Sequence, residues 1–336
     1  MNSSKNKSLV TGGCGFVGSH MVDLLINKGH EVIVIDDLST GVKENLFHHV
    51  DSPNVKIFVR DIADPDALEG IMDNVKWVFH FAAMADIVPS IVSPMTYFMA
   101  NANGTANLLE VSRAAGVERF IYAASSSCYG LPDTFPTPET AAIAPQYPYA
   151  MTKRIGEELV MHWSQVYSIP ALSLRMFNVY GPRHRTAGSY GAMFGVFLAQ
   201  KLAGEPLTIV GDGEQTRDFT FVTDVVDAYY TAAKSSLSGE VFNIGSDGTY
   251  SVNRIAELLG GECVHIPKRP GEPDCTWADI TKIKTLMGWS PKVGLEEGVR
   301  ILLDNIDGWK DAPVWTPDTI KEATADWFKY LGEKDA

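Results

Sequence analysis

Tyr149 and Lys153 are the two side chains of this sequence whose types and spacing most directly suggest chemistry. A tyrosine and a lysine four positions apart lie on one face of a helix, one turn from each other. A phenol loses its proton at about pH 10, and a neighbouring ammonium group favours the phenolate. The pair can therefore act as a general base on a hydroxyl group, if other residues supply a reaction for it.

A glycine-rich turn about 130 residues upstream supplies that reaction. Gly12, Gly15 and Gly18 are spaced as GxxGxxG between an apolar run and a helical pattern. Such a turn lets a pyrophosphate approach the backbone at a helix N-terminus. Asp36 ends the next apolar run and is placed to accept hydrogen bonds from a ribose, and Asp37 could do the same. A carboxylate there repels a 2′-phosphate, so NAD is favoured over NADP. A nicotinamide and a base together can oxidise a secondary alcohol.

Composition limits the class of protein and its compartment. The 336 residues allow one large domain or two modest ones, and 45% hydrophobic with 21% charged residues is ordinary for a soluble enzyme. The net charge of −13 argues against broad binding to nucleic acids or anionic membranes. Four cysteines without CxxC spacing predict free thiols in a reducing compartment. No signal-peptide core and no membrane-spanning run is present, so we expect a cytoplasmic protein. The adjacent pair His48-His49 lacks metal-ligand spacing, and no metal site is predicted.

Short apolar runs alternate with helical patterns through the first 180 residues. This alternation predicts an α/β fold, a Rossmann-type doubly wound parallel sheet, with polar or small residues after each strand. We expect an NAD-binding domain over 1–180 and a smaller mixed α/β lobe over 181–336, which binds the substrate. A helix is expected over 21–28, and an amphipathic one over 316–330 with Ile320, Ala323, Trp327 and Tyr330 on one side. The expected strands are 8–10, 31–35, 55–59, 77–81, 119–124, 171–176 and, returning from the second lobe, 241–244.

The chain resembles the extended short-chain dehydrogenases/reductases, in the group of NAD-dependent nucleotide-sugar epimerases and dehydratases that includes UDP-glucose 4-epimerase-like enzymes. The resemblance covers residues 7 to about 310. Its markers, in the order of the family, are 11–18, 36–39, 61–62, 80–83, Asn101 with Gly104 and Thr105, 125–127, 129–130, 149–153, 175–183, 211–219 and 269–271.

The resemblance implies a set of residues around NAD. Phe16 and Val17 would cover the pyrophosphate, Asp61 and Ile62 would flank the adenine, and Asn101 would orient the loops of the cofactor groove. The full implied set is Gly12, Gly15, Phe16, Val17, Gly18, Asp36, Asp37, Leu38, Ser39, Thr40, Gly41, Asp61, Ile62, Phe81, Ala82, Ala83, Ala85, Asn101, Ser125, Tyr149, Lys153 and Phe177.

The resemblance also implies catalytic and substrate-binding roles. Tyr149 would take a hydroxyl proton while C4 of a sugar gives hydride to NAD. Lys153 would bond the nicotinamide ribose and lower the pKa of the tyrosine, and Ser125 would bond the sugar hydroxyl. Guanidinium groups suit phosphate oxygens, so the arginines would clamp a diphosphate. The implied substrate residues are Asp86, Ser90, Ser125, Ser126, Tyr149, Asn178, Arg183, Arg217 and Arg269.

The residues after Ser125 favour one reaction among those of the family. A 4,6-dehydratase carries an Asp-Glu pair there and a decarboxylating relative a glutamate, whereas this chain has Ser126 and Ser127. Cys128 lies one position away from the cysteine of a 3,5-epimerising relative. We therefore predict a nucleotide-diphosphate-sugar 4-epimerase that passes through a transient 4-keto sugar, with a UDP-sugar favoured. The alternatives are a 4-dehydrogenase that releases the keto sugar, a 4,6-dehydratase, and an NAD-binding regulatory protein.

Two further expectations concern specificity and assembly. Asp86 could bond sugar hydroxyls or an amino group, and it would repel a uronic acid, or it could face solvent. The family usually dimerises through the helix bearing Tyr149 and the one before it. An apolar face of Ile155, Leu159 and Trp163 permits a homodimer, although a face buried within the chain would look the same.

Overall fold

A seven-stranded parallel sheet is the centre of the computed structural model, which describes residues 6–184 and 192–332. The strand order is β11-β6-β5-β4-β1-β2-β3, so all seven predicted strands are confirmed, including the late one that pairs with β6. Their bounds are β1 (Lys7–Thr11), β2 (Glu31–Asp36), β3 (Val55–Val59), β4 (Trp77–His80), β5 (Arg119–Ser125), β6 (Ala171–Met176) and β11 (Glu240–Ile244).

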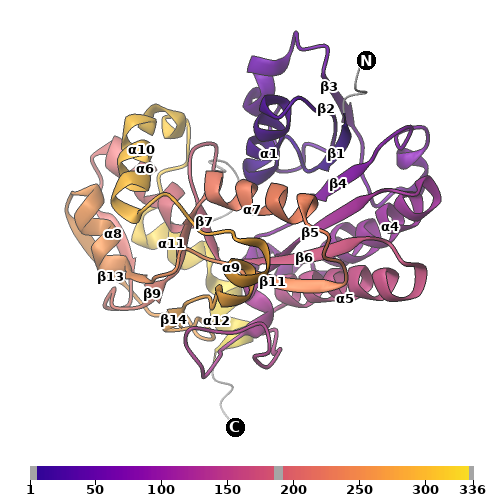
Figure 1. The fold of residues 1–336 in the computed structure, drawn as a ribbon. Helices are drawn as coiled ribbons and strands as arrows, with labels where there is room; N and C mark the ends of the chain where they lie inside the picture. The colour runs from indigo at the N-terminus through magenta and orange to yellow at the C-terminus, as the bar shows by residue number, and fades with distance from the viewer. Residues whose placement is uncertain (1–5, 185–191, 333–336) are drawn as a thin grey trace.

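Helices cover both faces of the sheet, as Figure 1 shows. On one face α1 (Phe16–Asn27) and α7 (Val222–Lys234) pack together in one apolar cluster. On the other, α4 (Gly104–Ala115) and α5 (Pro148–Tyr167) contribute to a second cluster. The helix predicted over 21–28 begins earlier, at Phe16, because the glycine turn leads straight into it while its first turn lacks an apolar pattern. The short elements between are η1 (Lys43–His49), η2 (Pro65–Leu68), α2 (Ile87–Val92), α3 (Pro94–Phe98), η3 (Met99–Asn103) and η4 (Ser126–Tyr129).

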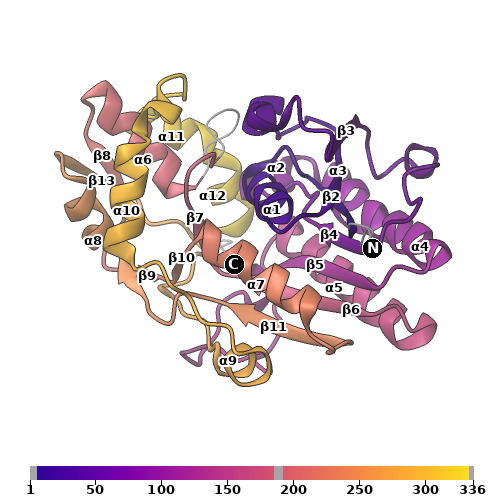
Figure 2. The same cartoon turned by 45° about the horizontal axis from the view of Figure 1, so that its top comes forward.

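A second lobe lies beside the sheet, to the left in Figure 2. Its own core includes Phe197, Ile209, Ile255 and Leu302, and it is organised around small sheets of two or three short strands rather than one large sheet. Its elements are β7 (Asn178–Tyr180), α6 (Met193–Ala203), β8 (Leu207–Val210), β9 (Thr216–Arg217), β10 (Phe219–Phe221), β12 (Tyr250–Ser251), α8 (Val252–Leu259), β13 (Cys263–Ile266), β14 (Cys275–Thr276), α10 (Leu295–Asp304) and η5 (Ile306–Trp309). The helix α9 (Thr281–Met287) instead packs against β11 of the large sheet.

The C-terminal segment differs from the single helix predicted over 316–330. It forms α11 (Pro317–Ala323) and α12 (Ala325–Leu331), which are separated at Thr324. The Thr324 hydroxyl donates to the carbonyl of Ile320 at 2.7 Å, a side-chain bond of the kind that bends helices. Ile320 and Trp327 are buried as predicted, whereas Tyr330 is 52% exposed because the break turns it away.

Two smaller observations complete the fold. All four cysteines are free thiols, as predicted, and burial raises the pKa of Cys14 and of Cys128 to about 12, so neither is a ready nucleophile at neutral pH. Across the ranges 6–184 and 192–332, no helix has both the length and the apolar character needed to cross a bilayer.

Candidate active site

The glycine turn lies where the strand order of the sheet reverses, between β1 and β4. Ligands of such sheets bind beyond the carboxyl ends of the strands at this place. Gly12 has φ +68°, and a Cβ there would lie 2.7 Å from the backbone nitrogen of Ala82. A Cβ on Gly18 would lie 2.1 Å from the Gly12 carbonyl oxygen. The backbone is therefore bare at the start of α1, and Gly15 leaves that helix N-terminus without a side-chain cap, which fits the pyrophosphate of a dinucleotide.

Asp36 is held at the end of β2 by backbone donors. Its carboxylate accepts hydrogen bonds from the amides of Cys14 and Leu38, each at 2.9 Å. Burial raises the pKa of Asp36, and these two bonds oppose that effect. Asp37 instead accepts hydrogen bonds from the amide and the hydroxyl of Ser39, in an exposed turn. Of the two adjacent carboxylates, Asp36 is thus the one enclosed beside the glycine turn, a position that fits a ribose of NAD.

Tyr149 and Lys153 project from the first turns of α5 beside the end of β5. Ser125 and Ser127, whose hydroxyl groups bond each other, lie beside the phenol of Tyr149. Burial raises the pKa of Tyr149, and the two serines oppose that rise. Lys153 is not among the groups that shift this pKa most, so its predicted effect on the pKa of Tyr149 stays a prediction. Burial lowers the pKa of Lys153 to about 7, and its Nζ lies 4.4 Å above the ring of Tyr122.

One cavity of about 630 Å³ joins the glycine turn, Tyr149 and the second lobe. Such a volume is typical of a site for a small molecule or cofactor. It is lined by most of the residues that the sequence predicted for a site: Gly12, Gly15, Phe16, Val17, Gly18, Asp36, Asp37, Ser39, Thr40, Asp61, Ile62, Phe81, Ala82, Ala83, Ala85, Asp86, Ser125, Tyr149, Lys153, Phe177, Asn178, Arg217 and Arg269.

Two guanidinium groups converge on one carboxylate at the second-lobe side of the cavity. Nη2 of Arg217 lies 3.1 Å from Oε1 of Glu272, and Nη1 of Arg269 lies 3.9 Å from its Oε2. The two arginine side chains are only 9% and 12% exposed, so they are not surface ion pairs. Both guanidinium groups line the cavity, where they can bind the oxygens of a dianionic diphosphate despite the acidic chain.

Comparison with known proteins identifies the family. The model of the NAD dependent epimerase/dehydratase family matches residues 8–245. The chain belongs to this family. It is an enzyme of the nucleotide-sugar epimerase type, and its cofactor is NAD.

Individual relatives of the family differ in what they do. A UDP-glucose 4-epimerase from Mycolicibacterium smegmatis is 35% identical over 302 residues, which cover 87% of this chain and 96% of the relative. UDP-glucuronic acid decarboxylase 4 from Arabidopsis thaliana is also 35% identical, over 88% of this chain and 67% of the relative. The crystal structure of a UDP-glucose 4-epimerase from Thermotoga maritima with UDP-glucose superposes with a TM-score of 0.83 at 37% identity, over 91% of this chain and 99% of that one.

Six predicted site residues do not line the cavity of this family member. Asn101 lies behind it, where its side chain bonds the backbone of Met84 and the hydroxyl of Thr152. The hydroxyl of the buried Ser90 donates to a carbonyl within α2. A Cβ on Gly41 would lie 2.8 Å from the Asp36 carboxylate, which explains a glycine there. The other three are Leu38, Ser126 and Arg183.

Arg183 is part of a separate polar cluster. Its Nη2 lies 2.7 Å from Oδ2 of Asp23, and the Nε2 atoms of His48 and His49 lie 2.6 and 2.7 Å from Oδ1. Asp23, His48 and His49 lie close enough together to hold a metal ion, a group that the spacing of the histidines did not predict. The adjacent histidines reach one carboxylate because they end a 3₁₀ helix that packs against α1. Hydrogen bonding to Asp23 accounts for the arrangement, and the Arg183 charge beside it opposes a bound cation.

Sequence reasoning missed several residues of the cavity. Ser127, rather than Ser126, reaches Tyr149, because the chain turns into η4 after β5. Glu272 and Trp327 come from the second lobe and the C-terminus, and the cavity is also lined there by Trp315 and Phe219. The run of three serines at 125–127 could have indicated Ser127. No pattern in the sequence indicates that the other residues reach the cavity.

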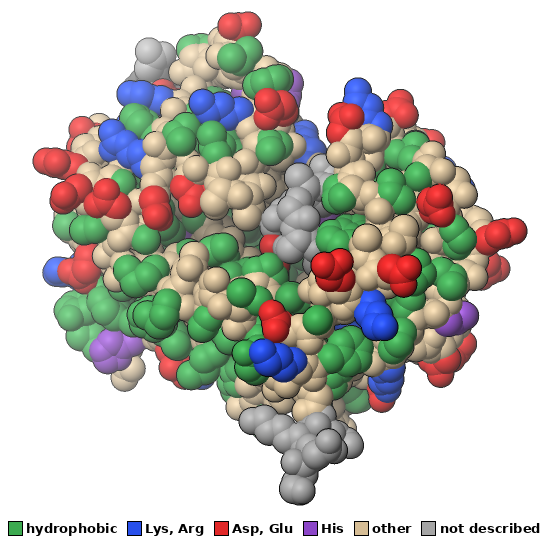
Figure 3. All heavy atoms as spheres, turned by 180° about the vertical axis from the view of Figure 1, so that it is seen from behind, with side chains coloured by type: hydrophobic (Ala, Val, Ile, Leu, Met, Phe, Trp, Pro, Cys, Tyr) green, Lys and Arg blue, Asp and Glu red, His purple; other side chains and the backbone are tan. Residues whose placement is uncertain are grey.

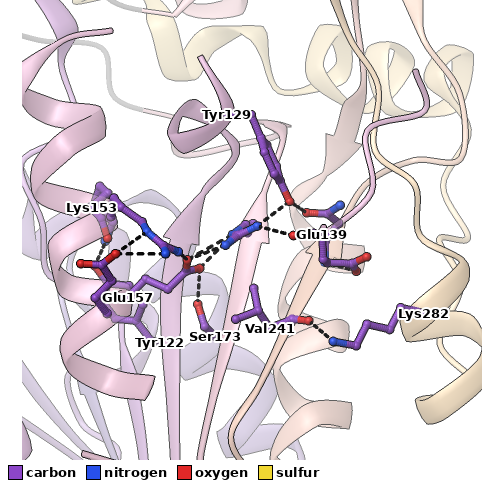
Figure 4. A network of polar contacts seen from close by, with 12 residues as sticks. Tyr122, Tyr129, Glu139, Lys153, Glu157, Ser173, Val241 and Lys282 are labelled. Carbon is purple, nitrogen blue, oxygen red and sulfur yellow. Dashed lines mark hydrogen bonds and ion pairs between the residues drawn. The ribbon is translucent and has the colours of Figure 1, made fainter. Parts of the chain in front are cut away.

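Behind Lys153, a buried ionic network fastens α5 to the sheet (Figure 4). Glu157 lies one turn after Lys153 and accepts three hydrogen bonds from Arg175 of β6. Ser173 donates to the same carboxylate at 2.8 Å, and Arg175 donates to the Tyr129 hydroxyl at 2.7 Å. Burial acts to raise the pKa of Glu157, but the bonds and charge of Arg175 outweigh it and lower the pKa. The negative charge of Glu157 in turn favours the ammonium form of Lys153.

Proposed function

We propose that the enzyme is a nucleotide-diphosphate-sugar 4-epimerase. The observation that carries the proposal is that Tyr149 and Ser125 line the same cavity as the glycine turn and the two enclosed arginines. A base, a dinucleotide cradle and a diphosphate clamp are thus within reach of one substrate. A UDP-sugar is favoured because relatives of both the epimerase and the decarboxylase kinds are named for UDP-sugars.

The residues divide the reaction among themselves. Tyr149 removes the C4 hydroxyl proton of the sugar, and Ser125 bonds the same oxygen and holds the sugar against the phenol. Lys153 bonds the nicotinamide ribose, and Arg217 and Arg269 bind the diphosphate. Bound NAD would supply reversible hydride transfer at C4, so no external oxidant is consumed. Because the diphosphate is anchored at a distance from C4, the keto sugar can turn so that its other face meets the cofactor groove. Tyr149 then returns the proton to the C4 oxygen, and the configuration at C4 is inverted by hydride delivery to that other face.

The neighbours of Tyr149 support epimerisation over elimination. A 4,6-dehydration needs an acid and a base at C5 and C6, and a hydroxyl group, that of Ser127, occupies the region where dehydratases carry carboxylates. The carboxyl group of Asp86 lines the cavity and acts on Tyr149 electrostatically. Its charge favours a sugar with neutral or amino substituents over a uronic acid. A 4-dehydrogenase that releases the keto sugar uses the same residues and is the second candidate.

A homodimer is the proposed assembly. Leu159 and Trp163 of the predicted face pack against the core of their own chain. Other apolar side chains around α3 to α5 are exposed, at 67% for Met95, 51% for Met151 and 52% for Val166. Figure 3 shows hydrophobic side chains gathered on the side of the molecule that bears α4 and α5. A second copy would cover such a surface, and light scattering of the purified protein would measure the mass of the assembly. With its four free thiols, the protein is also expected in the cytoplasm.

Product analysis tests the reaction. The purified protein is incubated with UDP-, dTDP-, GDP- and CDP-hexoses, and products are identified by NMR while absorbance at the NADH band is followed. Conversion of one sugar to its C4 epimer without net NADH is expected. Net NADH with a released 4-keto sugar would indicate the dehydrogenase, and loss of water from the sugar would indicate the dehydratase.

A further inference from the structure

The C-terminal helix α12 lies between the two lobes, as Figure 2 shows in yellow. It packs against α2, the helix that Asp86 precedes, and it brings Trp327 to the cavity. Trp327 is only 4% exposed, yet among the described residues it belongs to none of the three apolar clusters that form the core. The contacts of this buried indole lie instead with residues beside the cavity.

Trp327 contacts the arginine of the clamp and the residue after it. The Cζ atom of Arg269 lies 5.5 Å from the centre of the indole, within the range of a cation–π interaction. The indole nitrogen of Trp327 donates a hydrogen bond of 2.7 Å to the carbonyl of Pro270. The first contact holds the guanidinium group of Arg269, and the second holds the backbone at the next residue, Pro270. Trp327 therefore restricts the positions that the Arg269 side chain can take.

On its other side, Trp327 contacts aromatic rings that lead to the proposed base. Its indole lies 6.4 Å from the ring of Tyr147, measured between centroids. Tyr147 in turn stacks at 6.4 Å on Tyr149, with an angle of 9° between the planes. The side chains of Tyr149, Tyr147, Trp327 and Arg269 thus form a continuous series from the proposed proton acceptor to the proposed diphosphate clamp.

We propose that Trp327 is a positioning residue for substrate binding, which fixes Arg269 and sets its separation from Tyr149. The proposal rests on the proposed function for the identity of the substrate, but the contacts apply to any diphosphate ligand. Where one anchor binds the diphosphate and one base acts on the sugar, their separation selects the length of the substrate between them. The C-terminal helix is then a working part of the binding site.

Variants of Trp327 test the proposal through affinity. Trp327→Ala removes the ring and the N–H donor, and Trp327→Phe keeps a ring but loses the donor. We expect Trp327→Ala to raise KM and the Kd of UDP by about 10-fold, Trp327→Phe by about 3-fold, with kcat changed less than KM, because the contacts act on binding in ground and transition states alike. Phe328→Ala, on the exposed side of the same helix, is the matched control and should change neither constant.

A double-mutant cycle separates positioning from a general effect on folding. If Trp327 acts through Arg269, then Trp327→Ala should weaken UDP binding by less than about 2-fold in an Arg269→Ala background, since coupled residues are not additive. Equal losses in the two backgrounds would overturn the proposal. So would a Trp327→Ala protein that binds UDP as the control does. Circular dichroism and NAD content, expected to match the control, show whether each variant is folded, and the melting temperature of Trp327→Ala is expected to fall because a buried ring is lost.

The two proposals fail in different ways. Calorimetry with UDP, dTDP, GDP and CDP needs no turnover, so a Trp327 effect on binding without any epimerised product would sink the proposed function and keep the positioning role. If the wild-type protein epimerised a sugar and Trp327→Ala bound UDP normally, the proposed function would stand and the positioning role would be wrong. A wild-type protein that binds none of the four nucleotides would overturn both.

Discussion

Arg175 and Glu157 form a two-point ion pair in the interior, with Nη2–Oε1 at 2.7 Å and Nε–Oε2 at 3.0 Å. The pair joins β6 to α5 one helical turn beyond Lys153, and its side chains are 4% and 2% exposed. Removing one charge of a buried pair leaves the other without compensation in a medium of low dielectric constant. The position of the proposed catalytic helix therefore depends on this pair.

Glu157→Gln should lower the free energy of unfolding by about 3–5 kcal/mol, because Arg175 would stay charged and buried. Chemical denaturation measures the change. Glu158→Gln is the matched control: Glu158 is the next residue and pairs with Arg154 from a side chain that is 60% exposed. An exposed pair contributes about 1 kcal/mol or less. Equal effects of the two variants would contradict the structural importance given to the buried pair.

Tyr149→Phe should lower kcat by about 10² to 10⁴-fold, the range for loss of a general acid or base. NAD content should not change, since the ring remains. Tyr147→Phe is the matched control, because its hydroxyl is also bonded to Ser127 but it lies one ring further from the cofactor groove. Steady-state kinetics with the identified sugar give both values. A Tyr149→Phe enzyme as active as Tyr147→Phe would refute the assignment of the base.

Ser127→Ala should move the acidic limb of the kcat–pH profile to higher pH. The Ser127 bond lowers the pKa of Tyr149, so its loss raises that pKa, and the phenolate forms only at higher pH. Ser126→Ala should leave the limb in place, because Ser127 and not Ser126 is among the groups that lower the pKa of Tyr149 most. The reverse pattern would restore the role that the sequence predicted for Ser126.

The contrast between these serines shows where sequence reasoning stops. The glycine turn and Asp36 were predictable because each depends on a local run of residues with a fixed spacing. Which hydroxyl of a serine run reaches Tyr149 depends on the turn of η4, which no periodicity encodes. Trp327 and Glu272 reach the cavity from distant parts of the chain, and only tertiary packing brings them there. The break at Thr324 is likewise set by one side-chain bond inside an otherwise regular amphipathic pattern.

Arg217→Ala should raise KM by about 10- to 100-fold, the range for loss of a hydrogen bond to a charged group, while kcat changes less. Arg183→Ala provides the comparison. The sequence predicted a substrate contact for Arg183, whereas its guanidinium pairs with Asp23 and does not line the cavity. We expect its KM to stay within about 2-fold of wild type, because its half-buried ion pair lies outside the cavity. A rise as large as that of Arg217→Ala would show that Arg183 does reach the substrate.

Asp218 follows Arg217 and should make the stability of the fold depend on pH. Its carboxylate accepts hydrogen bonds from the amides of Ser246 and Ala278, at 2.6 and 3.0 Å. Burial raises the pKa of Asp218 from 3.8 to about 6. The stabilisation associated with the protonated folded state is complete below pH 3.8 and is lost as the pH rises through 6. The loss amounts to roughly 3 kcal/mol, because each pKa unit corresponds to about 1.4 kcal/mol.

Asp218→Asn should therefore flatten the fall in the free energy of unfolding between about pH 4 and 6. The altered hydrogen bonds of the amide shift the whole curve by a constant, so the slope is the quantity to compare. Denaturation at a series of pH values gives it for wild type and variant. The exposed Asp212→Asn is the control, and its slope should equal that of wild type. If Asp218→Asn kept the wild-type slope, the pKa of Asp218 would not be raised in the folded protein. The hydrogen bonds from the amides of Ser246 and Ala278 would then cancel the effect of burial on that pKa.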